Sequence, residues 1–283
     1  MKNCLLKILL IAWCYSITFI PASAQQLLVE EWSISDKFSM PESAAYDEIG
    51  EQIFVSNVNE YAKDGNGFVS KVSADGLDIE LQWLSGLNSP TGLAVHDRLL
   101  YVVDFDELVV VDIDQRRIIK KVPAPDEKPS LNDVAISDSG QVFVSGSSSN
   151  SIYELKKDQL EVWKHDDSLL KHANGLIVKD NMLITGGLNW LVFDLTSKQL
   201  IDGFKQPSPV IQEIDGITPD GCNGYFITLL DDQRIWRVGS SGRASAVSDL
   251  AINGIDIDHR QSKLYVPTVG GGLSVFTIES TCE

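Results

Sequence analysis

Residues 214–221 read Ile-Asp-Gly-Ile-Thr-Pro-Asp-Gly, and this short pattern recurs along the chain. In each copy a polar residue precedes a small or polar one and then apolar residues, followed by a turn rich in Asp, Asn and Gly and a second apolar run. The copies begin 38 to 49 residues apart (253−215 and 91−42), at Glu42, Thr91, Asn132, Asn174, Asp215 and Asn253. A period of about 40 residues built from short β segments is typical of propeller blades. The repeat therefore predicts six blades.

Each repeat divides into short segments rich in Val, Ile, Leu and aromatic residues, bounded by turn residues, and none shows a sustained helical period. The fourth repeat, for example, predicts its last strand at 200–204. The sixth repeat offers only three strands, at 255–257, 264–266 and 273–278, whereas residues 27–33 read as a strand without a partner nearby. We therefore predict an all-β, six-bladed β-propeller closed by the N-terminal strand joining the last blade, which removes an exposed sheet edge.

The N-terminus has the composition of a secretory signal. Lys2 and Lys7 flank an apolar run at 5–20, and Ala22-Ser23-Ala24 has the small-x-small form of a signal-peptidase site. We predict a signal peptide at 1–24, cleaved after Ala24, and a single propeller domain at 25–283 in the periplasm or outside the cell. An uncleaved anchor is the alternative. Since no later apolar stretch is long enough to cross a bilayer, no membrane span is expected in the mature chain.

Charge and cysteine content limit the partners. The chain carries 40 acidic and 23 basic residues, a formal net charge of −17. Nucleic acid and anionic membranes are therefore unfavourable partners, because both require a basic surface. An acidic surface attracts cations, although solubility alone also explains it. We expect a monomer that binds a small molecule. Cys222 and Cys282 remain after signal cleavage, and the sequence leaves open whether they form a disulfide.

The first strand of each propeller blade lines the central channel, so the six lead residues should meet at one mouth. Glu42, Asp215, Asn132 and Asn174 offer hard oxygen ligands, which suit Ca²⁺ best and Mg²⁺ or Mn²⁺ less well. Each residue alone could instead cap a turn. Two carboxylates and three amides in register favour a metal-binding mouth, because buried carboxylates need a partner or a cation.

His172 and Glu213 each lie two residues before a lead residue, so they should share its strand face and also point to the mouth. His172 is a candidate substrate contact or acid–base group, with an exposed rim histidine as the alternative.

Four tripeptides in order, Pro41-Glu42-Ser43, Leu131-Asn132-Asp133, Ala173-Asn174-Gly175 and Ile214-Asp215-Gly216, resemble the regucalcin/gluconolactonase (senescence marker protein-like) family of six-bladed propellers over residues 40–278. The resemblance implies a divalent cation, Ca²⁺ or else Zn²⁺, Mn²⁺ or Mg²⁺, held by Glu42, Asn174 and Asp215. It also implies that Asn132 contacts the substrate, a sugar lactone in most members. In the implied hydrolysis, Asp215 accepts a proton from the attacking water.

The sequence departs from the family pattern at two positions. Ser130 stands where members commonly carry an Arg that holds substrate oxygens, and Tyr46 replaces a usual Trp. Two hypotheses follow: a metal-dependent lactonase or esterase, favoured by the ligand set, and a non-catalytic propeller that binds a ligand or protein, favoured by Ser130. Strictosidine-synthase-like relatives share the expected fold but not the complete ligand set.

Overall fold

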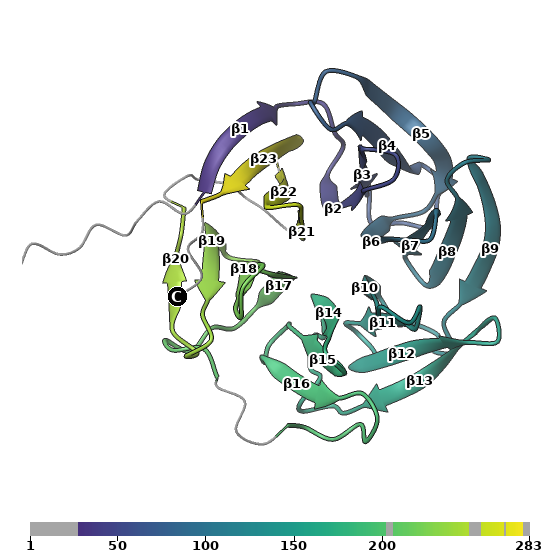
Figure 1. Cartoon of the computed structure of the whole chain (residues 1–283). Coiled ribbons are helices and arrows are strands. Elements are labelled where there is room, and N and C mark those ends of the chain that lie inside the picture. The colour runs from purple at the N-terminus through teal and green to yellow at the C-terminus, as the bar shows by residue number, and fades with distance from the viewer. Residues whose placement is uncertain (1–27, 202–205, 249–255, 269, 280–283) are drawn as a thin grey trace, which may run out of the picture.

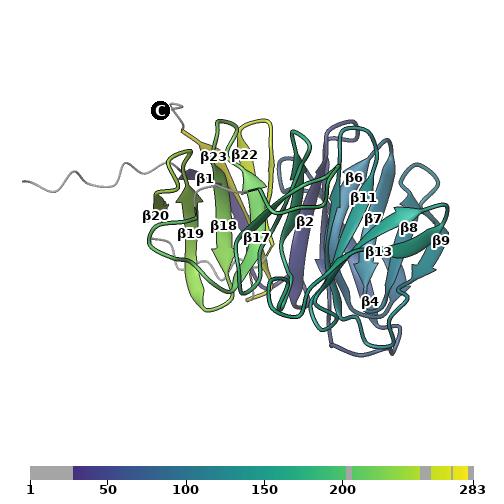
Figure 2. The same cartoon turned by 90° about the horizontal axis from the view of Figure 1, so that it is seen from below.

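The computed structural model describes residues 28–201, 206–248, 256–268 and 270–279. Their strands form six antiparallel sheets arranged around a central axis, with β2, β6, β10, β14, β17 and β21 innermost (Figure 1). Seen from the side, the sheets stand next to one another as blades (Figure 2). No α-helix occurs in the described residues. The prediction of an all-β, six-bladed propeller is confirmed.

Blades one to three each have four strands in chain order from the axis outward. Blade one contains β2 (Pro41–Asp47), β3 (Gln52–Asn57), β4 (Gly67–Ser73) and β5 (Ile79–Leu87). Blade two contains β6 (Pro90–His96), β7 (Leu99–Asp104), β8 (Glu107–Asp112) and β9 (Arg117–Pro123). Blade three contains β10 (Leu131–Ile136), β11 (Val142–Gly146), β12 (Ser151–Lys156) and β13 (Gln159–His165).

Blades four to six are less uniform. Blade four contains β14 (Leu176–Lys179), β15 (Met182–Thr185) and β16 (Leu191–Asp194). Blade five contains β17 (Ile214–Pro219), β18 (Tyr225–Leu229), β19 (Asp232–Val238) and β20 (Ala244–Ala246). Blade six contains β21 (Asp258–Arg260), β22 (Lys263–Thr268), β23 (Gly272–Ile278) and β1 (Leu28–Ile34).

Apolar side chains fill the spaces between neighbouring blades. Strands such as β7 and β8 are buried on both faces, because a blade packs on either side of them, whereas the outer strand β9 is largely exposed. Aromatic rings join particular blades: Trp163 contacts Phe143 and Phe193 edge-on, with ring centroids 5.8 Å apart in each pair, between blades three and four. Tyr46 and Tyr265 stack at 5.0 Å between blades one and six.

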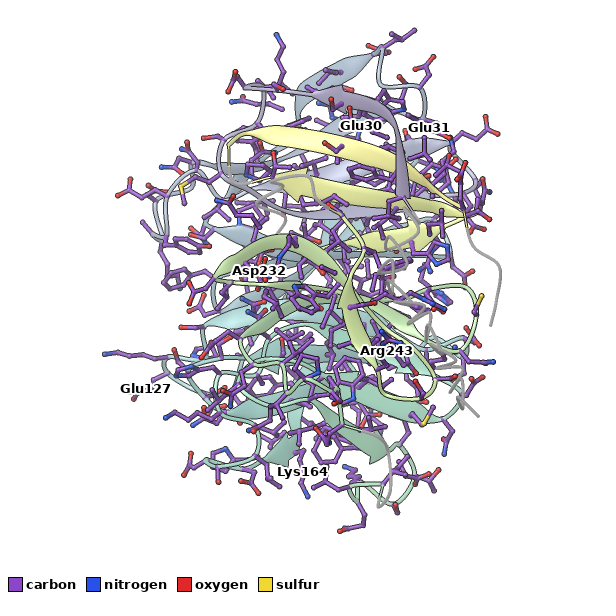
Figure 3. All side chains as sticks on the ribbon, turned by 90° about the vertical axis from the view of Figure 1, so that its left-hand side faces the viewer. Glu30, Glu31, Glu127, Lys164, Asp232 and Arg243 are labelled. Carbon is purple, nitrogen blue, oxygen red and sulfur yellow. The ribbon has the colours of Figure 1, made fainter. Side chains whose placement is uncertain are left out.

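The ring closes through the N-terminal strand, as the strand count predicted. β1 pairs antiparallel with β23, from Leu28 opposite Ile278 to Ile34 opposite Leu273. Figure 3 shows Glu30 and Glu31 on this outer strand, and Glu31 reaches across β23 to an ion pair with Lys263 at 2.6 Å. Blade six therefore combines both ends of the described chain.

One strand prediction falls mostly outside the described residues, and another was wrong. Among the described residues blade four has three strands. A fourth strand was expected at 200–204; Leu200 forms an isolated bridge with Phe193, and residues 202–204 lie outside the description. The inner strand of blade six is β21 at 258–260 rather than 255–257.

Other expectations fall wholly or partly on residues that the structure does not describe. The predicted signal peptide at 1–24, Asn253 and Cys282 lie outside the described residues. Cys222 is disulfide-bonded. In the part of the chain that is described, no helix has the length and apolar character needed to cross a membrane.

Candidate metal-binding mouth

The lead residues lie in a β-bulge that recurs at the start of the inner strands. The pairing register shifts between Pro41 and Ala44, and equivalent shifts occur in blades two, three and five. A hydroxyl of the second strand accepts a hydrogen bond from the backbone N–H that the bulge leaves unpaired. In blade one, Ser43 N donates to Ser56 Oγ at 2.9 Å. Thr228 Oγ1 accepts from Gly216 N in the same way, also at 2.9 Å. Because a bulge re-aims the side chains it contains, the same local device directs the lead residues of these four blades.

Left-handed backbone precedes the lead residue in blades one, three, four and five. Met40, Ser130, His172 and Glu213 each lie two residues before a lead residue, with φ between 41° and 56°. Such a conformation is uncommon for residues other than glycine and persists only where the surrounding structure holds it. Its repetition in register indicates that the fold fixes the approach of the chain to the mouth.

The three predicted metal ligands lie close together and are buried. Glu42, Asn174 and Asp215 are 3%, 7% and 3% exposed, although they come from blades one, four and five. Asn174 Nδ2 donates a hydrogen bond of 2.6 Å to Asp215 Oδ1. Glu42 is near enough for the charge of Asp215 to raise its pKa.

One buried oxygen on each of these three residues has no protein partner. Glu42 Oε2, Asn174 Oδ1 and Asp215 Oδ2 are among the few buried side-chain polar atoms of the described residues that make no hydrogen bond. Unsatisfied buried acceptors are costly, so their coincidence in one place requires an explanation. Two carboxylate oxygens and one amide oxygen form a hard donor set that fits Ca²⁺, Mg²⁺ or Mn²⁺.

The carboxyl groups at the axis repel one another. Burial first, and then the charges of Asp215, Asp256 and Asp133, raises the pKa of Glu42 well above its ordinary value. Burial also raises the pKa of Asp215 to about 7, although the hydrogen bond from Asn174 opposes the shift. Burial raises the pKa of Asp133 to about 7 as well. A bound cation would relieve this repulsion.

Asp133 and Asp256 are a second tier of acids that connect neighbouring blades. Asp133 Oδ1 accepts from the backbone N–H of Val134 at 2.7 Å, and its Oδ2 accepts from that of Leu176 in blade four at 2.6 Å. Asp256 repeats the arrangement, accepting from Ile257 N at 2.8 Å and from Ser43 Oγ in blade one at 2.6 Å. These two acids therefore occupy equivalent positions in blades three and six, and each accepts a hydrogen bond from the neighbouring blade.

This equivalence corrects the register of blade six. Asp133 directly follows the lead residue Asn132, so Asp256 marks the same place in blade six. The lead position is then residue 255 rather than Asn253, two residues from where the repeat placed it. The strand pairing agrees: Asp258 lies opposite Tyr265 as Ala45 lies opposite Phe54, which makes Asp256 the counterpart of Ser43.

The two predicted substrate-binding residues lie around the buried set. Asn132 is half-buried in β10, and its backbone oxygen accepts from Thr91 Oγ1 of blade two at 2.7 Å. His172 is exposed on the rim, and its backbone N–H donates to Asn150 Oδ1 at 3.3 Å. Ser130 is also exposed and accepts from Ser148 Oγ at 2.8 Å.

Tyr61 is a mouth residue that the repeat did not reveal, because it lies in the loop between β3 and β4. Partial desolvation, and then the charges of Glu42 and Asp215, raises the pKa of Tyr61 to about 12. The residue is nonetheless 63% exposed. Tyr61 therefore lies at the edge of the acidic centre with a surface available to a ligand.

The opposite end of the channel holds a cavity of about 320 Å³. Asp133 and Asp256 lie in its lining, together with Tyr46 and Arg260 near the far ends of their strands. Tyr46, the departure from the family Trp, thus belongs to this cavity and to the stack with Tyr265 rather than to the mouth. Among the described residues, no group of three or more His, Cys, Asp or Glu side chains is arranged to hold a metal ion, so the candidate set depends on the amide of Asn174.

The class of protein that these observations define is a six-bladed β-propeller with a buried acidic centre. Known structures of similar fold include a gluconolactonase from Xanthomonas campestris, with a TM-score of 0.68 and 16% identity over 86% of this chain and 88% of that one. Virginiamycin B lyase from Staphylococcus aureus has a TM-score of 0.63 and 10% identity over 87% and 98% of the two chains.

A protein of unknown function from Bacteroides thetaiotaomicron is similar too, with a TM-score of 0.68 and 11% identity over 90% of this chain and 72% of that one. No protein-family model and no curated protein matches the sequence. At these identities the structural likeness shows the fold alone.

Proposed function

We propose that this protein is an exported, divalent-cation-dependent hydrolase of the gluconolactonase type, which opens a lactone or related ester at the mouth. The observation that carries the proposal is the set of three unpartnered buried oxygens on Glu42, Asn174 and Asp215. A cation, Ca²⁺ by preference, supplies Lewis-acid polarisation of the ester carbonyl when bound. The likeness to the Xanthomonas gluconolactonase supports the choice of ester chemistry.

Asp215 is the proposed general base. Asn174 orients its carboxylate through the 2.6 Å hydrogen bond to Oδ1, which leaves Oδ2 without a protein partner. Without a cation, burial raises the pKa of Asp215 to about 7; a bound cation would lower this pKa and so favour the carboxylate, the form that accepts a proton from water. Glu42 completes the ligand set, and Asn132 and His172 contact the substrate from blades three and four.

The second candidate is a non-catalytic propeller that binds a ligand or protein at the same mouth and keeps the cation. It is favoured by Ser130, which provides a small hydroxyl where the resembling family carries an Arg. In both cases the protein acts as a periplasmic or secreted monomer on a small molecule, and the acidic composition disfavours nucleic acid.

Two measurements test the proposal. Calorimetry with Ca²⁺, Mn²⁺, Mg²⁺ and Zn²⁺ should detect one site, which Asp215→Ala abolishes. A panel of lactones assayed with each cation should then show hydrolysis that the same substitution removes. Because one similar fold is a lyase, the product should be formed in H₂¹⁸O: hydrolysis incorporates one labelled oxygen and elimination does not. Binding without turnover would select the second candidate, and no cation binding would overturn both metal-based versions.

A further inference from the structure

Exposed apolar side chains gather beside the buried ligands of blades one and five. Met40 lies two residues before Glu42 and is 46% exposed. Leu230 is 58% exposed, and its backbone N–H donates to the oxygen of Glu213, two residues before Asp215. With Tyr61, these residues place apolar surface at the mouth of an otherwise acidic protein.

The loop that carries Tyr61 is anchored on both sides of the ring. Val58 N donates to the oxygen of Met40 at 3.1 Å, which holds the start of the loop against the mouth. The buried Ser89 accepts from Ala62 N at 3.0 Å and donates to the oxygen of Glu60 at 2.8 Å. The backbone of Tyr61 is thus fixed between two hydrogen-bonded neighbours while its ring faces solvent. An aromatic side chain with only two torsions, on a backbone that is already held, costs little entropy to use in binding.

The position two residues before Asn132 in blade three is polar but uncharged. Ser130 lies at this position, and its Oγ accepts a hydrogen bond from Ser148 Oγ at 2.8 Å, so two hydroxyls lie side by side there. The equivalent position in blade five carries the half-buried acid Glu213. Glu213 would repel a negatively charged ligand. The equivalent residues of the other blades, Met40, Ser130 and His172, carry no permanent positive charge that would offset this repulsion.

From this arrangement we infer that the mouth selects an uncharged ester or lactone with an apolar ring beside its carbonyl, and that Tyr61 is the specificity-determining residue which packs on that ring. The inference rests on the proposed function and narrows its substrate class. Ser130 and Ser148 contact substrate oxygens on the opposite side of the mouth. Polyhydroxylated lactones, and lactones that carry a carboxylate, are poor substrates by comparison.

The test compares three lactones of similar ring size with Ca²⁺ present: one bearing a phenyl group, one polyhydroxylated and one bearing a carboxylate. The phenyl lactone should have the highest kcat/KM. Tyr61→Ala should lower kcat/KM for the phenyl lactone about tenfold, mainly through KM, and change that for the polyhydroxylated lactone less than about twofold. Tyr61→Phe keeps the ring and should retain the preference. Leu77→Ala, which alters a side chain 86% exposed on a distant turn, is the matched control.

Calorimetric binding of the non-hydrolysable cyclic ketone that corresponds to each lactone separates the inference from the proposed reaction. Preferential binding of the phenyl ketone, lost in Tyr61→Ala, supports the inference even in the absence of turnover. If turnover occurs but Tyr61→Ala affects all three lactones equally, or if the polyhydroxylated or anionic lactone is preferred, the inference is overturned while the hydrolase proposal stands. Equal binding of the three ketones also overturns it.

Discussion

Asn174 and Asp215 belong to different blades, 41 residues apart in sequence, and are joined by a 2.6 Å hydrogen bond from Nδ2 to Oδ1. The bond fixes the amide orientation, so Asn174 Oδ1 and Asp215 Oδ2 are left as acceptors in a buried place. Such an arrangement costs stability unless a cation occupies it. Function and stability are therefore expected to oppose each other at this mouth.

Replacing Asp215 should expose that opposition. Asp215→Asn keeps the shape but removes a buried charge, so it should weaken Ca²⁺ binding by roughly 100-fold while leaving the cation-free protein as stable or more stable at pH 7. Calorimetry measures the affinity and urea unfolding measures the stability. Asp231→Asn, at an exposed position, should change neither. A cation-free variant that unfolds more easily would show that Asp215 is structural.

The pH dependence of stability follows from the raised pKa values. The pKa values of Asp215 and Asp133 are about 7 in the folded protein, against about 3.9 for an unperturbed Asp in an unfolded chain. Between these values the folded state binds more protons, so the free energy of unfolding should fall as pH rises from about 4 to about 7. Carboxyls with lowered pKa values, such as Asp47 and Asp194, act in the opposite direction only at lower pH.

Calcium should reverse this loss, and its stabilisation should grow with pH because protons compete for the same oxygens. At 100 times the dissociation constant the gain is about 2.7 kcal/mol. Urea unfolding at pH 5, 6 and 7, with Ca²⁺ and with a chelator, measures both effects. Stability that rises with pH over this interval without Ca²⁺ would contradict the buried acids being protonated in the folded state.

Gly175 tests how tightly the backbones crowd at the mouth. A Cβ at this position would lie 2.1 Å from the backbone oxygen of Asp215, and no flexible side chain can move aside. Gly175→Ala should therefore lower stability by about 1–3 kcal/mol and also weaken cation binding by displacing Asp215. Gly270→Ala is the control, since no atom lies within 4 Å of the added Cβ. If Gly175→Ala destabilises the protein but leaves its cation affinity unchanged, then the close packing at Gly175 does not position Asp215 for cation binding.

Closure of the ring should depend on the contact between blades one and six. Tyr265 is 2% exposed and stacks on Tyr46, so Tyr265→Ala should cost about 3–5 kcal/mol. The exposed ion pair between Glu31 and Lys263 should contribute less than about 1 kcal/mol, as Glu31→Gln would show in the same urea titration. Comparable effects of the two substitutions would mean that β1, rather than the aromatic stack, holds the ring closed.

Much of the fold could be predicted because its signals are local. The spacing of the copies and the strand missing from the last repeat were enough for six blades and for closure by the N-terminal strand. Hairpins within a blade form between neighbouring segments, so turn residues and apolar alternation report them directly. The same register places Glu42, Asn174 and Asp215 at one end of the channel, where each has an unpartnered buried oxygen.

The remaining features depend on contacts between blades, which no local pattern reports. The register of blade six became clear only because Asp256 bonds Ser43 of the next blade as Asp133 bonds Leu176. Tyr61 reaches the mouth because a loop outside the repeat is anchored on Ser89. The sequence by itself determined the blades and the polar lead residues, since both follow from the repeat spacing, and the family resemblance singled out Glu42, Asn174 and Asp215 as candidate ligands. Only the tertiary structure decided which acids share the axis and which loop borders them, because burial and charge repulsion depend on how blades pack.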